Sequence, residues 1–165
     1  MNKKVVCHDV NNNLFEVDST ELKFRPSIYG VLIKDNNVLL SKQWDGYDFP
    51  GGGVEIYETI EEAIKREFFE ETGLEVEMAS PVHCESSFYV PHHSKGKDDR
   101  WNCILIYYLV RQIGGELSTA NLDESEKEYV KLAEWVSLDH LDKIKFYCSV
   151  DAKEIIRAAA LIDKN

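Results

Sequence analysis

The stretch from residue 52 to residue 74, GGVEIYETIEEAIKREFFEETGL, joins a glycine-rich loop to a charged segment with both helix ends marked. Thr59 followed by Glu62 forms the T-x-x-E pattern of a capping box, so we expect the helix to start at residue 60. Gly73 suits the left-handed position that follows a last helical turn. The local signals therefore predict a helix over residues 59–72.

This helix carries three glutamates on the side that is expected to face the protein interior. At about 100° per residue they continue an apolar stripe instead of joining the solvated face. The glutamates are Glu67, Glu70 and Glu71, and the stripe consists of Ile60, Ala63 and Ile64. Carboxylates held together and away from water repel one another and lose hydration. Hard cations such as Mg²⁺ take oxygen ligands, so the pattern favours a metal site, with a solvated acidic helix end as the alternative.

The complete stretch resembles the signature box of the Nudix hydrolases, G-x5-E-x7-R-E-U-x-E-E-x-G-U, in which U is a bulky apolar residue. All nine specified positions are filled, by Gly52, Glu58, Arg66, Glu67, Phe68, Glu70, Glu71, Gly73 and Leu74. The resemblance implies the Nudix fold, an α/β/α sandwich around a mixed β-sheet. It also implies metal-dependent hydrolysis of a diphosphate linkage, in a nucleoside triphosphate or another nucleoside diphosphate derivative, by metal-activated water.

The resemblance also implies roles for single residues. It makes the three glutamates the ligands of Mg²⁺ or Mn²⁺, and it pairs Arg66 with Glu58 to steady the loop against the helix. Gly52 and Gly53 would let the loop backbone approach the metal and the phosphates. Such ions neutralise phosphate charge and acidify a bound water, from which a carboxylate takes a proton.

Further candidates lie outside the box. The family often adds a glutamate from a loop before a late strand, and residues 122–135 offer Glu124, Glu126 and Glu128. We favour Glu128, which is closest to the strand, although a solvated acidic loop is the alternative. Lys42 and Arg25 are candidates for binding a substrate phosphate. For Lys42 a solvated strand end fits the sequence equally well.

Four aromatic residues are candidates for stacking on a nucleobase: Trp44, Phe88, Tyr89 and Trp101. Packing in the core or in a loop is the alternative for each of them, and nothing in the sequence chooses among the four.

Length and composition set outer limits. The 165 residues contain no repeat and no linker, which predicts one domain over residues 1–165. No apolar run reaches the length of a membrane span, and the start, MNKKVVCHDV, lacks the apolar core of a secretory signal. A cytoplasmic protein without membrane contact is the expectation, and both a monomer and a homodimer are compatible with it.

The net charge of -11 at pH 7 argues against nucleic acid as a partner, because nucleic acids favour a basic surface. It leaves room for a small phosphorylated nucleotide held through cations. The four cysteines are far apart in sequence and form no C-x-x-C pair, so we expect reduced thiols.

The remaining pattern predicts many strands and a second helix, which is typical of a mixed α/β sheet covered by helices. We expect hairpins at 4–10 with 14–17 and at 27–34 with 37–43, a loop at 44–55, extended segments at 74–78, 82–90, 101–112 and 130–138, a turn at 114–115, and a helix at 149–162.

Two other functions are kept open. A nucleotide-binding Nudix module without catalysis, acting as a sensor or regulator, would be indicated by a broken set of carboxylates, and here the set is complete. An isomerase of isoprenyl diphosphates would need a cysteine near the site, for which Cys84 and Cys103 are candidates.

Overall fold

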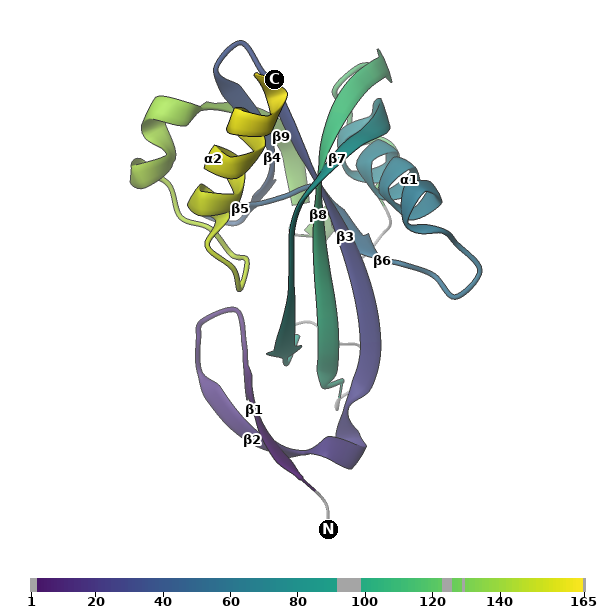
Figure 1. Ribbon diagram of the computed structural model, residues 1–165, viewed down its shortest axis with the longest axis vertical. Coiled ribbons are helices and arrows are strands. Elements are labelled where there is room, and N and C mark those ends of the chain that lie inside the picture. The colour runs from purple at the N-terminus through teal and green to yellow at the C-terminus, as the bar shows by residue number, and fades with distance from the viewer. Residues whose placement is uncertain (1–2, 92–98, 123–125, 129, 165) are drawn as a thin grey trace.

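The computed structural model describes residues 3–91, 99–122, 126–128 and 130–164 (Figure 1). Within these ranges nine strands form one mixed sheet with two α-helices. The strands are β1 (Lys4–His8), β2 (Leu14–Asp18), β3 (Lys23–Lys34), β4 (Asn37–Gln43), β5 (Gly46–Asp48), β6 (Gly51–Gly53), β7 (Leu74–Tyr89), β8 (Trp101–Gly115) and β9 (Val130–Ser137). The helices are α1 (Ile60–Thr72) and α2 (Ala152–Asp163), and 3-10 turns cover Ser19–Glu21, Glu126–Glu128 and Leu138–Lys143.

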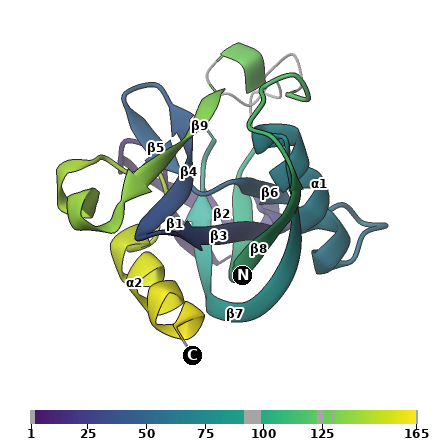
Figure 2. The ribbon, with the colours of Figure 1, turned by 90° about the horizontal axis from the view of Figure 1, so that it is seen from above.

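The sheet runs in the order β2-β1-β7-β8-β3-β4-β5, while β6 pairs with β3 and β9 with β4. The long strands β3 and β8 are parallel, and β7 is antiparallel to β8. The helices lie on opposite sides of these strands, and the β1–β2 hairpin extends to the far end of the molecule (Figures 1 and 2). The predicted α/β fold around a mixed sheet is therefore confirmed.

Each helix packs on its own buried cluster. The cluster under α1 includes Ile64 and Phe68 against Ile28 and Leu39, all with no more than 3% exposure. The cluster under α2 is built around Tyr107 and includes residues of β3, β4 and β8. The strands β3, β4, β8 and β9 supply buried residues to both clusters, because successive side chains point to opposite faces of the sheet. This alternation decides which strand residues can reach the acidic side of α1.

Both predicted ends of α1 are confirmed. Thr59 and Glu62 form the reciprocal capping box, and Gly73 ends the helix with φ 76° while its N–H bonds to the Phe69 carbonyl. Ala63 and Ile64 are fully buried, as the stripe predicts, but Ile60 is 36% exposed. The prediction for Ile60 is wrong because this residue lies in the first turn, next to an exposed loop that contains Tyr57.

Other boundaries differ from the sequence-based expectations in detail. Both hairpins form, but the loop at 44–55 contains the short strands β5 and β6, because their backbones pair with β4 and β3. The segments on either side of residue 80 are one strand, β7, whose register shifts accommodate Pro81. Gly114 and Gly115 are the paired end of β8 and not a separate turn. Helix α2 begins at Ala152, after the cap Asp151.

All four cysteines are free, as expected. In the part of the chain that the structure describes, neither α1 nor α2 has the length and hydrophobicity that a membrane-spanning helix requires.

Candidate active site

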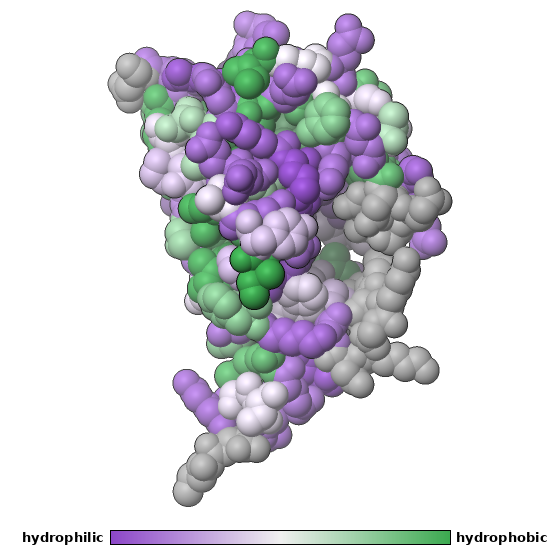
Figure 3. Space-filling model, turned by 90° about the vertical axis from the view of Figure 1, so that its right-hand side faces the viewer, coloured by the Kyte–Doolittle hydropathy of each residue, from purple (hydrophilic) through white to green (hydrophobic). Residues whose placement is uncertain are grey.

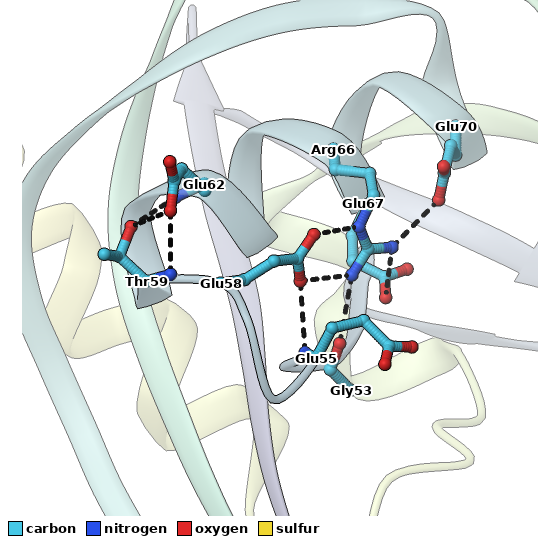
Figure 4. A network of polar contacts seen from close by, with 8 residues as sticks. All are labelled: Gly53, Glu55, Glu58, Thr59, Glu62, Arg66, Glu67 and Glu70. Carbon is cyan, nitrogen blue, oxygen red and sulfur yellow. Dashed lines mark hydrogen bonds and ion pairs between the residues drawn. The ribbon is translucent and has the colours of Figure 1, made fainter.

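Arg66, in the middle of α1, is the centre of a polar network (Figure 4). Its Nε and Nη2 donate to both carboxylate oxygens of Glu58 at 2.6 and 2.9 Å. Nη2 also donates to the carbonyl oxygen of Gly53 at 3.1 Å. These bonds raise the pKa of Arg66, with Glu58 the largest cause, and the same bonds lower the pKa of Glu58. The ion pair implied by the sequence resemblance is present, and it ties the glycine-rich loop to the helix.

The three glutamates do not occupy equivalent positions. Glu67 and Glu71 are 8% and 7% exposed and line a cleft. Arg66 Nη1 lies 2.9 Å from Glu67 Oε1, and Ser41 Oγ donates to Glu71 Oε2 at 2.6 Å. The side chain of Glu70 is 38% exposed, pairs with Arg66 Nη1 at 3.0 Å, and is not among the residues that line the cleft. Two of the three carboxylates therefore face the cavity, and the third faces Arg66.

Two glycines shape the loop that faces these carboxylates. A Cβ atom on Gly52 would lie 2.6 Å from the Oε1 of Glu67, which is closer than packed atoms approach. A Cβ atom on Gly53 would lie 2.8 Å from Nη2 of Arg25. The bare backbone at these positions lets Glu67 and Arg25 approach the loop from two sides.

The cleft has a volume of about 380 Å³ and is bounded by α1, the glycine loop and the ends of β3, β7 and β8. Arg25 lies in its wall, with the guanidinium carbon 4.2 Å from the centroid of the Trp101 ring. The indole Nε1 of Trp101 is buried and has no hydrogen-bond partner among the residues that the structure describes. Hydrophilic residues gather over the side of the molecule that carries α1 (Figure 3).

Asp48 is a cleft residue that no sequence pattern indicated. Its Oδ1 accepts a hydrogen bond from the backbone N–H of Phe49 at 2.8 Å. Burial nevertheless raises the pKa of Asp48 to about 7. It also borders a smaller inner chamber of about 110 Å³, which Tyr29 and Cys103 line as well. The sequence shows only that a carboxylate precedes the glycine run by three residues. That arrangement is typical of an ordinary turn and does not indicate a site residue.

Lys42 does not join the cleft lining. Its neighbour Ser41 points toward α1, so Lys42 points to the other face of β4. There its Nζ donates to the Tyr47 hydroxyl at 2.9 Å and lies 3.7 Å from a carboxylate oxygen of Glu134. Of the two predicted phosphate-binding cations, the structure places Arg25 in the cleft wall and Lys42 outside it.

The acidic loop before β9 is described only in part. Glu128 is exposed at the end of a 3-10 turn and is not among the described residues that line the cleft. Glu124 and the side chain of Glu126 lie outside the described part of the chain. Among the stacking candidates, Trp44, Tyr89 and Trp101 line the cleft, whereas Phe88 does not.

Two of the three box glutamates, but not the third, are positioned to bind a hard divalent cation. No three acidic, histidine or cysteine side chains converge on one point in the described residues. Glu67 and Glu71 are one helical turn apart and offer buried carboxylate oxygens in the same cleft, which suits Mg²⁺ or Mn²⁺. Glu70 would have to exchange its ion pair with Arg66 to join them.

Three comparisons place these features among known proteins. The family model described as NUDIX domain matches residues 23–158. An ADP-ribose pyrophosphatase of Methanocaldococcus jannaschii is 34% identical over 136 residues, which cover 79% of this chain and 70% of that protein. An RNA pyrophosphohydrolase of Xylella fastidiosa strain Temecula1 is 31% identical over 151 residues, which cover 84% and 78%. The crystal structure of an ADP-ribose pyrophosphatase from Streptococcus suis superposes with a TM-score of 0.63 at 19% identity, covering 86% of this chain and 92% of that one.

Proposed function

The chain belongs to the Nudix family of pyrophosphohydrolases, and from this premise we propose that it cleaves the diphosphate linkage of a nucleoside diphosphate derivative with the help of Mg²⁺ or Mn²⁺. The observation that carries the proposal is the pair of buried carboxylates, Glu67 and Glu71, which face a cleft that Arg25 also lines.

The charges of this cleft explain why a cation belongs in the reaction. The negative charges of Glu67 and Glu71 would repel a diphosphate, even with Arg66 Nη1 at 2.9 Å from Glu67. A divalent ion held by Glu67 and Glu71 would neutralise phosphate charge and lower the pKa of a water molecule. The protein contributes by holding the two carboxylates in position. Ser41 fixes Glu71 by a 2.6 Å hydrogen bond, and Arg66 holds Glu67 against the loop.

In the proposed reaction the oxygen of a water molecule forms a bond to one phosphorus, and the bond from that phosphorus to the bridging oxygen breaks. The water proton passes to a carboxylate of the cleft, for which Glu67 and Glu71 are the candidates that the geometry supports. We assign to Arg25, which lines the cleft, the binding of a phosphate or of the group attached to it. Lys42 and Glu128 have no part in the proposal, because neither lines the cleft.

ADP-ribose is the substrate type that we favour, because the curated relative with 34% identity carries that activity in its name. A 5′-triphosphate RNA end is the second candidate, supported by the relative with 31% identity. The net charge of -11 opposes binding of a long RNA backbone. The sensor alternative predicts nucleotide binding without turnover.

The test is a panel of ADP-ribose, nucleoside triphosphates, nucleotide sugars and a 5′-triphosphate oligoribonucleotide, each with Mg²⁺ or Mn²⁺ in ¹⁸O-labelled water. We expect ADP-ribose to yield AMP and ribose 5-phosphate, with the label in one product, which identifies the phosphorus attacked. Absence of turnover of every compound by folded protein would contradict the proposal and favour the sensor.

Glu71→Gln tests the site itself. We expect it to reduce kcat by at least about a hundredfold with the fold intact, since a neutral amide loses the charge that a cation site needs. Glu61→Gln is the matched control, because Glu61 lies on the solvated face of the same helix and pairs with Lys65. Full activity of Glu71→Gln would refute the assigned role.

A further inference from the structure

The turn between β4 and β5 contains a backbone conformation that its residue does not favour. Gln43 pairs with Gly46, so Trp44 and Asp45 are the two central residues of a tight hairpin turn. Trp44 has φ 40°. In this left-handed region the Cβ of an L-residue crowds the backbone, and a bulky residue is a genuine outlier there. Glycine is the usual choice at such a turn position.

The other residues with positive φ are of types that tolerate it. Among the described residues other than glycine, they are Asn12, Asp35 and Asn36. Short polar side chains stabilise this conformation through local hydrogen bonds, which an indole cannot do. Trp44 therefore adopts this conformation at a cost to folding, and such strain is characteristic of residues at functional sites.

Trp44 lies where a substrate would enter. It lines the same cleft as Glu67 and Glu71, and 37% of its surface is exposed. Tyr147 is another cleft residue, and its ring meets the Trp44 ring edge to face, with centroids 5.1 Å apart and planes at 74°. This contact orients the indole at the cleft.

Two other aromatic rings of the cleft already have stacked partners. The ring of Trp101 carries the Arg25 guanidinium at 4.2 Å. Tyr29 stacks on Tyr107, with centroids 5.1 Å apart and planes 18° from parallel. Trp44 and Tyr89 have contacts of their own as well, so exposure at the cleft and the conformation of its turn, not a lack of partners, distinguish Trp44.

We propose that Trp44 is a specificity-determining residue on which the nucleobase of the substrate stacks while the diphosphate lies near Glu67 and Glu71. The proposal rests on the proposed function, because it assumes that the diphosphate binds in this cleft. Every nucleobase has a π-face, so the indole selects for the presence of a base more than for its identity. Because the connection between β4 and β5 has only two residues, the positive φ of Trp44 is what directs its indole toward the cleft.

Two analogues that resist hydrolysis separate the base from the diphosphate: α,β-methylene-ADP and methylenediphosphonate. Their affinities with Mg²⁺ are measured by titration calorimetry for wild type and Trp44→Ala. We expect Trp44→Ala to bind α,β-methylene-ADP about tenfold to a hundredfold more weakly, the usual size of base stacking, and methylenediphosphonate as well as wild type. Trp44→Phe should restore most of the lost affinity.

Trp135→Ala is the matched control. Trp135 is also a tryptophan of similar exposure, 36%, but it lies on β9 and lines a different cavity. Trp135→Ala should leave the affinities for α,β-methylene-ADP and for methylenediphosphonate unchanged. The proposal is overturned if Trp44→Ala leaves the affinity for α,β-methylene-ADP unchanged, if it weakens both analogues equally, or if Trp135→Ala has the same effect.

Thermal melting separates the strain from the binding role. Trp44→Gly should melt at a higher temperature than Trp44→Ala, because glycine adopts positive φ without cost, yet both should bind the nucleotide analogue weakly. Wild-type affinity in Trp44→Gly would overturn the proposal. If wild type binds α,β-methylene-ADP no more tightly than methylenediphosphonate, the stacking role of Trp44 is refuted. The proposed function is tested separately, by hydrolysis of the substrate panel.

Discussion

Replacing Gly52 by alanine is expected to disable the active site with little effect on the stability of the fold. The added Cβ would lie 2.6 Å from Cδ and Oε1 of Glu67 and 2.7 Å from Oε2. An ordinary contact begins near 3.4 Å, so the carboxylate has to move by about 0.8 Å. The φ of Gly52 is not positive, so alanine fits the backbone, and the end of a flexible side chain can yield at small cost.

The cost appears in catalysis. A misplacement of about 1 Å reduces rates by about a hundredfold, equivalent to about 2.7 kcal/mol in the barrier. We therefore expect Gly52→Ala to lower kcat for the best substrate of the panel about a hundredfold, with a melting temperature close to that of wild type. The measurement combines steady-state kinetics over a Mg²⁺ titration with thermal melting.

Gly114→Ala is the control for this substitution. Its Cβ would lie 2.8 Å from Oε2 of Glu75, another flexible carboxylate, at the end of β8 and away from the lining of the cleft. It should keep wild-type kcat. A Gly52→Ala enzyme with kcat within about twofold of wild type would refute the argument, as would an equal loss in Gly114→Ala.

Three further predictions follow from single contacts. Arg66→Lys loses the two-pronged bond to Glu58, and the free energy of unfolding should fall by about 2 kcal/mol in a urea titration; an unchanged midpoint contradicts this. Ser41→Ala releases Glu71 and should lower kcat about tenfold without unfolding the protein, whereas unchanged kinetics would remove Ser41 from the site. Burial raises the pKa of Asp48 from 3.8 to about 7, so the fold favours its protonated form. Its contribution to stability is complete below about pH 4 and is lost as the pH rises through 7. Between pH 5 and 8, without metal, the melting temperature should fall less in Asp48→Asn than in wild type, and parallel curves would refute the assignment.

The features that the sequence predicted correctly are those set by neighbouring residues. The capping box at Thr59 and the left-handed Gly73 mark α1 because each signal acts within one helical turn. Helical periodicity placed Glu67 and Glu71 inward for the same reason. Glu70 is at the margin of that face, and its side chain pairs with Arg66. Helical periodicity alone does not predict this ion pair.

The features that were missed depend on contacts between distant segments. Lys42 was grouped with the site by its position before the glycine loop, but the phase of β4 turns it to the other face. Asp48 is partly buried in the cleft wall because β5 pairs with β4, which no local pattern reveals. The strain at Trp44 follows from a turn of only two residues, which requires the strand pairing to be known.

The packing around Glu67 bears on the choice between an enzyme and a nucleotide sensor. Binding a diphosphate through a cation requires negative charge at the site, which the carboxylates supply in many orientations. Catalysis also requires that the charge be held in one place, because reacting groups tolerate little displacement. Glu67 lies between Arg66 at 2.9 Å and a loop position where an added methyl group would displace its carboxylate. A sensor would have no use for that confinement and should tolerate Gly52→Ala, so the close fit of Gly52 against Glu67 favours hydrolysis as the reason this geometry is kept.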